Sequence, residues 1–406
     1  MKFELLAPAG DKEKLETAFY FGADACYFAG KKWGLRAFSE NFNDNELQEY
    51  IDYAHQLGKK AYITVNIQAH NEDFEGLADY LKYLYKIKAD AIIVSDAGIL
   101  SLAKQVVPKL PVHLSTQACA SNKYSAKFWA EAGAKRIILA RELSLTEIKE
   151  IRDYLPPEVE LEAFVHGAMC ISYSGRCLLS NYLCNRDSNR GQCVQACRWE
   201  YRIQEVSRDG EGLEIQEDNR GTYILNSKDL CMVEYLDKMA EAGITSFKIE
   251  GRMKSPFYVA TVINTYRRVL DLLEKNPKKF KAKPEWKTEL ENCSHRKFTT
   301  GFCLGEHDRE CLESSTPISK SEFIAIVTAP TKKGYCEVEQ RNRFKVGEEL
   351  EILSPTNTFK KKFIVGEMFD EQGNPVVDAL RVQQKLKVRV PFRLNKGDII
   401  RKTTSN

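Results

Sequence analysis

The sequence lacks several features that would assign it to a membrane or secreted class. It has no run of about 18 consecutive apolar residues, so we expect no membrane-spanning helix. Its first residues, MKFELLAPAGDKEK, lack the apolar core of a secretory signal, so we expect a cytoplasmic protein without a membrane partner. Repeats and low-complexity tracts are also missing. The absence of these features favours a cytosolic globular protein.

The sequence also lacks a large excess of charge of either sign. The chain has 60 Lys and Arg against 57 Asp and Glu, a net charge of +3 over 406 residues. Such a balance excludes a coat of positive charge over the whole surface. Binding to a nucleic acid would therefore depend on local basic patches.

The unusual abundance is cysteine, with 12 residues. In a secreted protein this number would indicate disulfides. In a reducing compartment it indicates metal, cluster or redox chemistry instead.

Short apolar segments alternate with amphipathic ones through the first 270 residues, and this alternation predicts the fold. Eight strands followed by helices favour an α/β fold, a TIM-like (β/α)8 barrel, over a doubly wound sheet. The expected strands are Phe3–Ala9, Ala25–Ala29, Ala61–Asn66, Ala91–Asp96, Val112–Ala118, Arg136–Ala140, Leu161–Gly167 and Ser246–Gly251.

The pattern divides the chain into three parts. Residues 1–273 form the predicted barrel domain, with a Cys-rich insertion at 168–225 that is far longer than the usual connection of about 2–6 residues. Residues 274–322 form a basic linker or helical segment. Residues 323–406 have short strands with turn signals, which predict a small C-terminal all-β barrel.

Polar residues accumulate where the predicted strands end, and barrel enzymes place their chemistry at that mouth. On the seventh strand Glu162, Phe164 and His166 are expected to share one face. Ionisable side chains at such positions indicate proton transfer, and the expected catalytic residues are Glu162, His166, Glu250 and Asp96. Cations and amides beside them suit an anionic, carboxylate-bearing substrate, with Arg36, Asn66, His113, Gln117, Arg141, Lys248 and Arg252 as the expected ligands.

The insertion carries two loosely spaced pairs of cysteines. Six residues separate Cys170 from Cys177, and three separate Cys193 from Cys197. Neither is a CxxC pair, which disfavours a zinc ribbon. An iron–sulfur cluster accepts looser spacing. The spacing alone leaves a cluster, zinc and uncommitted thiols open, with Cys184 and Cys231 as reserve ligands.

Hydrolysis is a weaker interpretation. A nucleophilic cysteine could pair with His166 or His113. A serine nucleophile is less favoured, because ISYSG around Ser172 and Ser174 is not a G-x-S-x-G elbow.

Several segments together resemble the collagenase-like peptidase family U32. They are ELLAPAG, GADACYFAG, HLSTQ, AFVHGAMCISYSGRCLLS and KIEGRMKS, and the resemblance extends over essentially the whole chain. The segments NRGQCVQACRWEY and NSKDL are most similar to the branch of this family that hydroxylates tRNA.

This resemblance implies an enzyme that converts the wobble uridine of tRNA to 5-hydroxyuridine, with prephenate as the hydroxyl source. It also implies a 4Fe–4S cluster on Cys170, Cys177 and Cys193, with Cys197 or Cys231 as the fourth ligand. The alternatives are a U32 peptidase and a nucleic-acid-binding accessory subunit. A paralogous or homo-oligomeric partner chain is left open.

A tRNA partner would require local cationic surface and aromatic side chains. The candidate basic segments are Lys275–Lys287, Lys360–Lys362 and Lys385–Arg389, and the candidate stacking residues are Tyr173, Tyr182 and Trp199.

Overall fold

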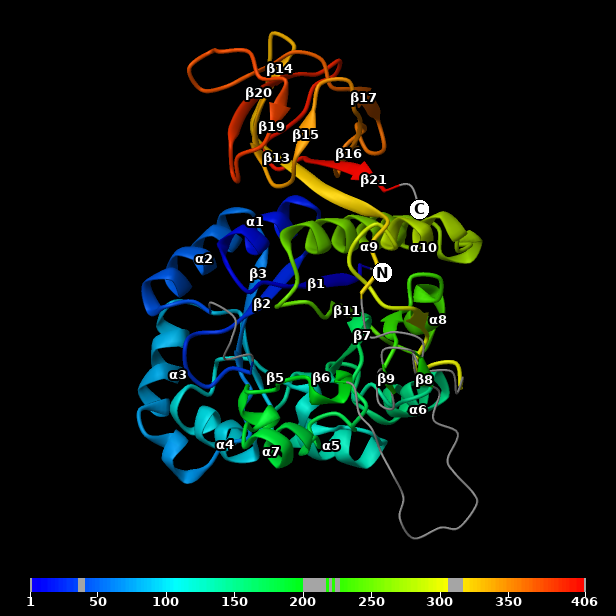
Figure 1. Ribbon diagram of the computed structural model, residues 1–406. Helices are drawn as coiled ribbons and strands as arrows, with labels where there is room; N and C mark the ends of the chain where they lie inside the picture. The colour runs from blue at the N-terminus through cyan, green and yellow to red at the C-terminus, as the bar shows by residue number, and fades with distance from the viewer. Residues whose placement is uncertain are drawn as a thin grey trace.

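The predicted barrel is confirmed by a computed structural model, which describes residues 2–35, 41–199, 227–305 and 317–404 and the backbone of 217–218 and 221–222. Parallel strands pair in the order β11-β1-β2-β3-β4-β5-β6-β7, and β11 also pairs with β7, which closes the barrel (Figure 1). The barrel strands are β1 (Glu4–Pro8), β2 (Ala25–Phe28), β3 (Lys60–Val65), β4 (Ala91–Val94), β5 (Val112–Leu114), β6 (Arg136–Ile138), β7 (Glu160–Ala168) and β11 (Ser246–Ile249).

Helices surround the barrel because their apolar residues recur at helical spacing. In α2 the buried residues Leu47, Tyr50, Ile51 and Ala54 follow the i, i+3, i+4, i+7 pattern, and Asn43 begins the helix with a capping box. The helices are α1 (Lys12–Tyr20), α2 (Asp44–Gln56), α3 (Leu77–Lys86), α4 (Ala97–Val106), α5 (Lys123–Glu131), α6 (Leu145–Tyr154), α7 (Leu179–Cys184), α8 (Leu236–Glu241), α9 (Pro256–Lys275) and α10 (Pro284–Leu290).

Strand β7 is the longest strand of the barrel and changes partners along its length. Its first half pairs with β6 and β11, and a register shift occurs where Lys248 faces Phe164 and Ile249 faces His166. One extra residue, Val165, therefore forms a β-bulge. Beyond it, β7 pairs antiparallel with β10 (Asp229–Cys231), which pairs with β12 (Phe298–Thr299). The region expected as a linker thus adds a strand beside the insertion.

Buried ion pairs fill part of the barrel interior. Arg136 Nη1 lies 2.5 Å from Glu4 Oε1 and 2.9 Å from Glu162 Oε2. Lys248 Nζ lies 2.8 Å from Glu162 Oε1. The two carboxylates and two cations balance, as buried charges require. We call these four residues the ion ladder.

The C-terminal residues form an antiparallel half-barrel, which confirms the predicted all-β domain. Its sheet order is β17-β16-β21-β13-β14-β20-β18, and its sheet strands are β13 (Ser321–Lys332), β14 (Tyr335–Gln340), β16 (Glu349–Leu353), β17 (Lys362–Ile364), β18 (Met368–Phe369), β20 (Lys385–Arg389) and β21 (Ile399–Thr403). A short pair, β15 (Phe344–Lys345) with β19 (Asp378–Ala379), also belongs to this domain. Another short pair, β8 (Glu217–Asp218) with β9 (Gly221–Thr222), lies in the insertion.

The C-terminal domain lies against α1, α9 and α10, on the outside of the barrel (Figure 1). Phe323 stacks on Phe257 of α9, and buried Arg401 forms two hydrogen bonds to Glu289 of α10, at 2.5 and 3.1 Å. Among the helices that the structure describes, none is long and apolar enough to cross a membrane.

Candidate active site

A cavity of about 370 Å³ lies between the insertion and the carboxyl ends of the barrel strands, and four cysteines line it: Cys170, Cys177, Cys193 and Cys197. We call it the cysteine cavity. A smaller cavity of about 80 Å³ is the barrel mouth itself. Gln117, Arg141 and Glu250 line both. The cysteines and the polar strand ends therefore border one continuous region.

Glycines allow the insertion to approach the barrel closely. A Cβ on Gly175, which has φ +72°, would lie 2.0 Å from the carbonyl oxygen of Gln117. A Cβ on Gly167, with φ +112°, would lie 2.6 Å from the carbonyl oxygen of Glu250. Only glycine tolerates both the positive φ and the contact.

Polar contacts fix the insertion to the barrel loops. The backbone N–H of Ser174 donates to Glu142 at 2.9 Å. Arg190 forms an ion pair with Asp73, and Gln68 N–H donates to the Asn189 carbonyl at 2.9 Å. The cysteines are thus held over the barrel from two sides.

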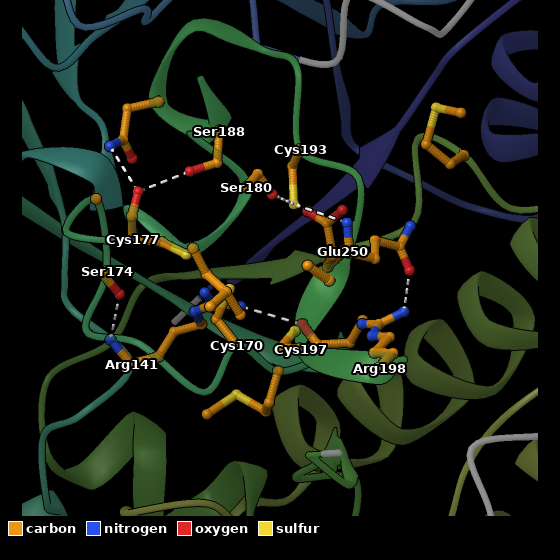
Figure 2. A pocket seen from close by; sticks show the side chains of 18 of the residues that line it. Arg141, Cys170, Ser174, Cys177, Ser180, Ser188, Cys193, Cys197, Arg198 and Glu250 are labelled. Carbon is orange, nitrogen blue, oxygen red and sulfur yellow. Dashed lines mark hydrogen bonds between the residues drawn. The ribbon is translucent and has the colours of Figure 1, made fainter. Parts of the chain in front are cut away.

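Hydrogen bonds also orient the cysteines themselves. The Cys193 sulfur accepts the backbone N–H of Gln195 at 3.4 Å and faces the Ser180 hydroxyl at 3.9 Å. The carbonyl of Cys177 accepts from Ser188 at 2.7 Å. Figure 2 shows the four cysteine side chains around a common space, with Glu250 and Arg198 beside it. Donors aimed at sulfur are characteristic of thiolate ligands.

The pKa of the Cys197 thiol is affected by the three other cysteines of the cavity. Burial and then the charges of Cys170, Cys193 and Cys177 raise this pKa to about 11, while the charge of Arg198 acts in the opposite direction. Mutual repulsion of this kind disfavours free thiolates and is relieved when a cation binds them.

A single zinc ion and an iron–sulfur cluster place different demands on four thiols. Among the described residues, no three Cys, His, Asp or Glu side chains are grouped closely enough to hold one metal ion. A zinc ion needs four ligands at about 2.0–2.3 Å. A 4Fe–4S cluster binds each cysteine through a different iron, so its ligands stand farther apart.

The reserve cysteines lie elsewhere. Cys231 is buried in β10, opposite His166, where burial raises its pKa to about 12 and Tyr266 contacts it. Neither Cys231 nor Cys184 lines the cysteine cavity. Of the two predicted fourth ligands, Cys197 is therefore the one that the fold brings to the other three.

Most of the predicted substrate ligands do meet at the barrel mouth, namely Asn66, Gln117, Arg141, Lys248 and Arg252. Four of them already have partners. Asn66 accepts the N–H of Leu35 at 3.2 Å, and Arg141 donates to the Ala168 carbonyl at 3.0 Å. Lys248 belongs to the ion ladder, and Arg252 donates to the Leu35 carbonyl at 2.8 Å and to Asn41.

Of the other two predicted ligands, one is described by the structure. His113 does not line the barrel mouth, since its ring packs edge-on against Tyr62 at 4.7 Å. Burial and then the charge of Arg136 lower the His113 pKa well below its ordinary value. Arg36 lies outside the described residues.

Of the four predicted catalytic residues, all of which the structure describes, only Glu250 lines either of these two cavities. Glu162 is fully buried in the ion ladder, with both carboxylate oxygens paired. Asp96 caps α4 by accepting the N–H of Ile99 at 3.0 Å. These two carboxylates have structural partners that account for their positions.

The prediction that His166 shares a face with Glu162 and Phe164 is wrong. The bulge at Val165 adds one residue and reverses the alternation, so His166 turns outward. Its ring lies among Tyr258, Tyr266 and Phe298. Burial lowers its pKa to about 3.

Sequence reasoning missed three cations of the cysteine cavity, Arg198, Lys254 and Arg296. Arg198 follows Cys197 directly, and Lys254 lies within KIEGRMKS, so both stood inside segments already singled out. Arg296 lies in the expected linker, and nothing local in the sequence distinguishes it.

Comparisons with protein-family models and with known proteins agree on one family for this chain. A family model described as Peptidase family U32 matches residues 10–313, and one described as the Peptidase family U32 C-terminal domain matches residues 319–401. The chain is 39% identical to tRNA hydroxylation protein P1 of Bacillus subtilis over 99% of this chain and 95% of that protein.

Two further relatives carry different names. A 23S rRNA 5-hydroxycytidine synthase of Escherichia coli is 36% identical over 67% of this chain and 40% of that protein. A collagenase of Porphyromonas gingivalis is 31% identical over 87% of each chain. Over both its barrel and its C-terminal domain, the chain belongs to peptidase family U32.

Proposed function

We propose that this protein is a cytoplasmic iron–sulfur enzyme that hydroxylates the wobble uridine of tRNA at C5, with prephenate as the hydroxyl source. The observation that supports this most is the shared wall of the two cavities, where Gln117, Arg141 and Glu250 face both the cysteines and the barrel mouth. The name of the Bacillus subtilis relative, which matches nearly the whole chain, supports the RNA substrate.

The residues that would hold a 4Fe–4S cluster are Cys170, Cys177, Cys193 and Cys197. Such a cluster supplies one-electron redox chemistry when it is bound. The N–H of Gln195, which donates to the Cys193 sulfur, would stabilise negative charge on that ligand.

Hydroxylation exchanges groups between two substrates. A hydroxyl of the donor replaces the C5 hydrogen of uracil, and the donor carbon receives hydrogen, so atoms and electrons balance between them. Glu250 lies where both cavities meet and is the proposed group for moving the C5 proton. Arg141 borders the same region, donates to the Ala168 carbonyl at 3.0 Å and would orient an acidic group.

The insertion offers a surface for an extruded base. Tyr173 lines the cysteine cavity and is 59% exposed, while Tyr182 and Trp199 of the same insertion are 88% and 44% exposed. Exposed aromatic rings beside a cavity can stack a base that has left its helix. Residues 168–199 contain four Arg against one Asp, which supplies the local positive charge that the whole chain lacks.

A peptidase function has less support in the geometry. The predicted dyads need His166 or His113 beside a nucleophilic cysteine. Cys231 lies opposite His166, but it is buried and its pKa is raised to about 12. His166 faces α9, and neither it nor His113 lines the cysteine cavity.

The test is an in vitro reconstitution. We expect the anaerobically purified protein to be brown, with about four iron and four sulfide, and to form 5-hydroxyuridine in tRNA from a deletion strain when prephenate is added. Nucleoside mass spectrometry measures the product, and a reaction without prephenate is the control. Binding of tRNA without product would contradict the proposal and favour the accessory subunit.

A further inference from the structure

Three cations from distant parts of the chain meet on one wall of the cysteine cavity. Arg198 ends a short helical turn of the insertion, Lys254 follows β11, and Arg296 precedes β12. The acidic residues near them are Asp229 of β10, which is buried, and Glu250, which lines the same cavity.

Within the described part of the chain, their charges are only partly compensated. Arg296 is 7% exposed, lies 3.5 Å from Asp229 through Nη1, and its Nε has no hydrogen-bond partner. Lys254 Nζ donates to the Ser294 carbonyl at 3.2 Å and forms no ion pair. Arg198 donates to the side-chain oxygen of Gln195 at 2.5 Å.

Counting Arg141 and Glu250, which also line the cavity, the described residues place four cations against two carboxylates, an excess of two positive charges. Burial lowers the pKa of Lys254, and the nearby charges of Arg296 and Arg198 act in the same direction. Like charges packed in a cavity are costly unless an anion binds among them.

The arrangement distinguishes this wall from the thiols. Arg198 follows Cys197 directly in the chain. Lys254 instead donates to the Ser294 carbonyl, and Arg296 pairs with Asp229 of β10. Lys254 and Arg296 are therefore held by contacts outside the insertion that carries the proposed cluster ligands.

We propose that Lys254 and Arg296, with Arg198 beside them, form the subsite that binds the carboxylate groups of a small organic dianion used as co-substrate. The proposal rests on the proposed function and moves the carboxylate site from the barrel mouth, where Lys248 is already paired with Glu162. A cavity of about 370 Å³ suits a small molecule. Phosphates of an RNA are bound by exposed cations instead, and Arg296 is buried.

The test uses the full-length protein and prephenate as the probe. Charge-assisted hydrogen bonds are worth about 1.5–3 kcal/mol, so Lys254→Met should raise the KM for prephenate about 10- to 100-fold. The kcat at saturating prephenate, the iron content and the affinity for tRNA should change much less. Lys254→Arg should restore most of the affinity, and Lys109→Met, at an exposed lysine before β5, is the matched control.

Arg296 needs a different design, because its removal would leave Asp229 buried without a counter-ion. The double variant Arg296→Met/Asp229→Asn removes both charges and should raise the KM for prephenate to a similar extent. An unchanged KM in Lys254→Met and in this double variant would overturn the subsite. Loss of iron would assign the cations to the cluster, and weaker tRNA binding alone would assign them to RNA; either result also overturns it.

Calorimetry separates this inference from the proposed function. If the wild-type protein binds prephenate and Lys254→Met binds it at least tenfold more weakly, the subsite stands even when no 5-hydroxyuridine is formed. If the wild-type protein binds no prephenate, the subsite is wrong whatever the enzyme does to tRNA.

Discussion

Replacing Glu162 by Gln should destabilise the barrel, because this carboxylate holds two buried cations. Its oxygens lie 2.9 Å from Arg136 and 2.8 Å from Lys248, and all three side chains are at most 4% exposed. The four residues of the ion ladder are neutral together, and Glu162→Gln would leave them with one excess positive charge, while Arg136 keeps its ion pairs with Glu4 and with the half-exposed Glu160. Removing one partner of a buried ion pair costs about 3–5 kcal/mol. For about 300 residues that unfold together, this corresponds to a fall in Tm of about 5–8 °C.

The assay is thermal unfolding followed by circular dichroism. The double variant Glu162→Gln/Lys248→Met restores neutrality and should recover most of the lost Tm, because replacing both partners of a buried pair is often close to neutral. A single variant that keeps the wild-type Tm but loses turnover would refute this reasoning. Glu162 would then be a catalytic residue, as its place on the strand first indicated.

Two further predictions concern the cysteines and the buried histidine. Cys197→Ala should lose iron and the brown colour after reconstitution, whereas Cys231→Ala should keep about four iron; an iron assay decides, and the reverse result would exchange the two roles. Because burial lowers the pKa of His166 to about 3 in the folded state, the unfolded chain binds an extra proton between about pH 6.5 and pH 3. Stability should therefore fall as pH decreases through that window, by up to about 1.4 kcal/mol per pH unit. His166→Phe should flatten that fall in urea titrations and keep turnover, and a variant that folds but is inactive would contradict the structural role.

The barrel could be predicted from sequence because its signals are local. Each expected strand overlaps a barrel strand of the structure, since buried parallel strands have short apolar segments such as Ala91–Val94. The four cysteines could be assigned to one site for a similar reason, because all of them lie in a single insertion.

The remaining features depend on contacts between distant residues. The alternation of side chains on β7 predicted that His166 faces inward, but alternation holds only without a bulge, and the pairing with β11 creates one. Glu162 was predicted to be catalytic because the sequence around it does not reveal its ion-pair partners. These are Arg136 and Lys248 of other strands, 26 and 86 residues away. The approach of Arg296 to Arg198 and Lys254 likewise requires β12 to pair with β10.

The most direct test of the account is nucleoside mass spectrometry of tRNA from a deletion strain. We expect 5-hydroxyuridine and nucleosides derived from it to disappear, to return with the wild-type gene, and to stay absent with Cys197→Ala expressed at the same level. An unchanged nucleoside profile in the deletion strain would contradict the proposed function. Full restoration by Cys197→Ala would contradict the assignment of the cysteine cavity as the reacting centre.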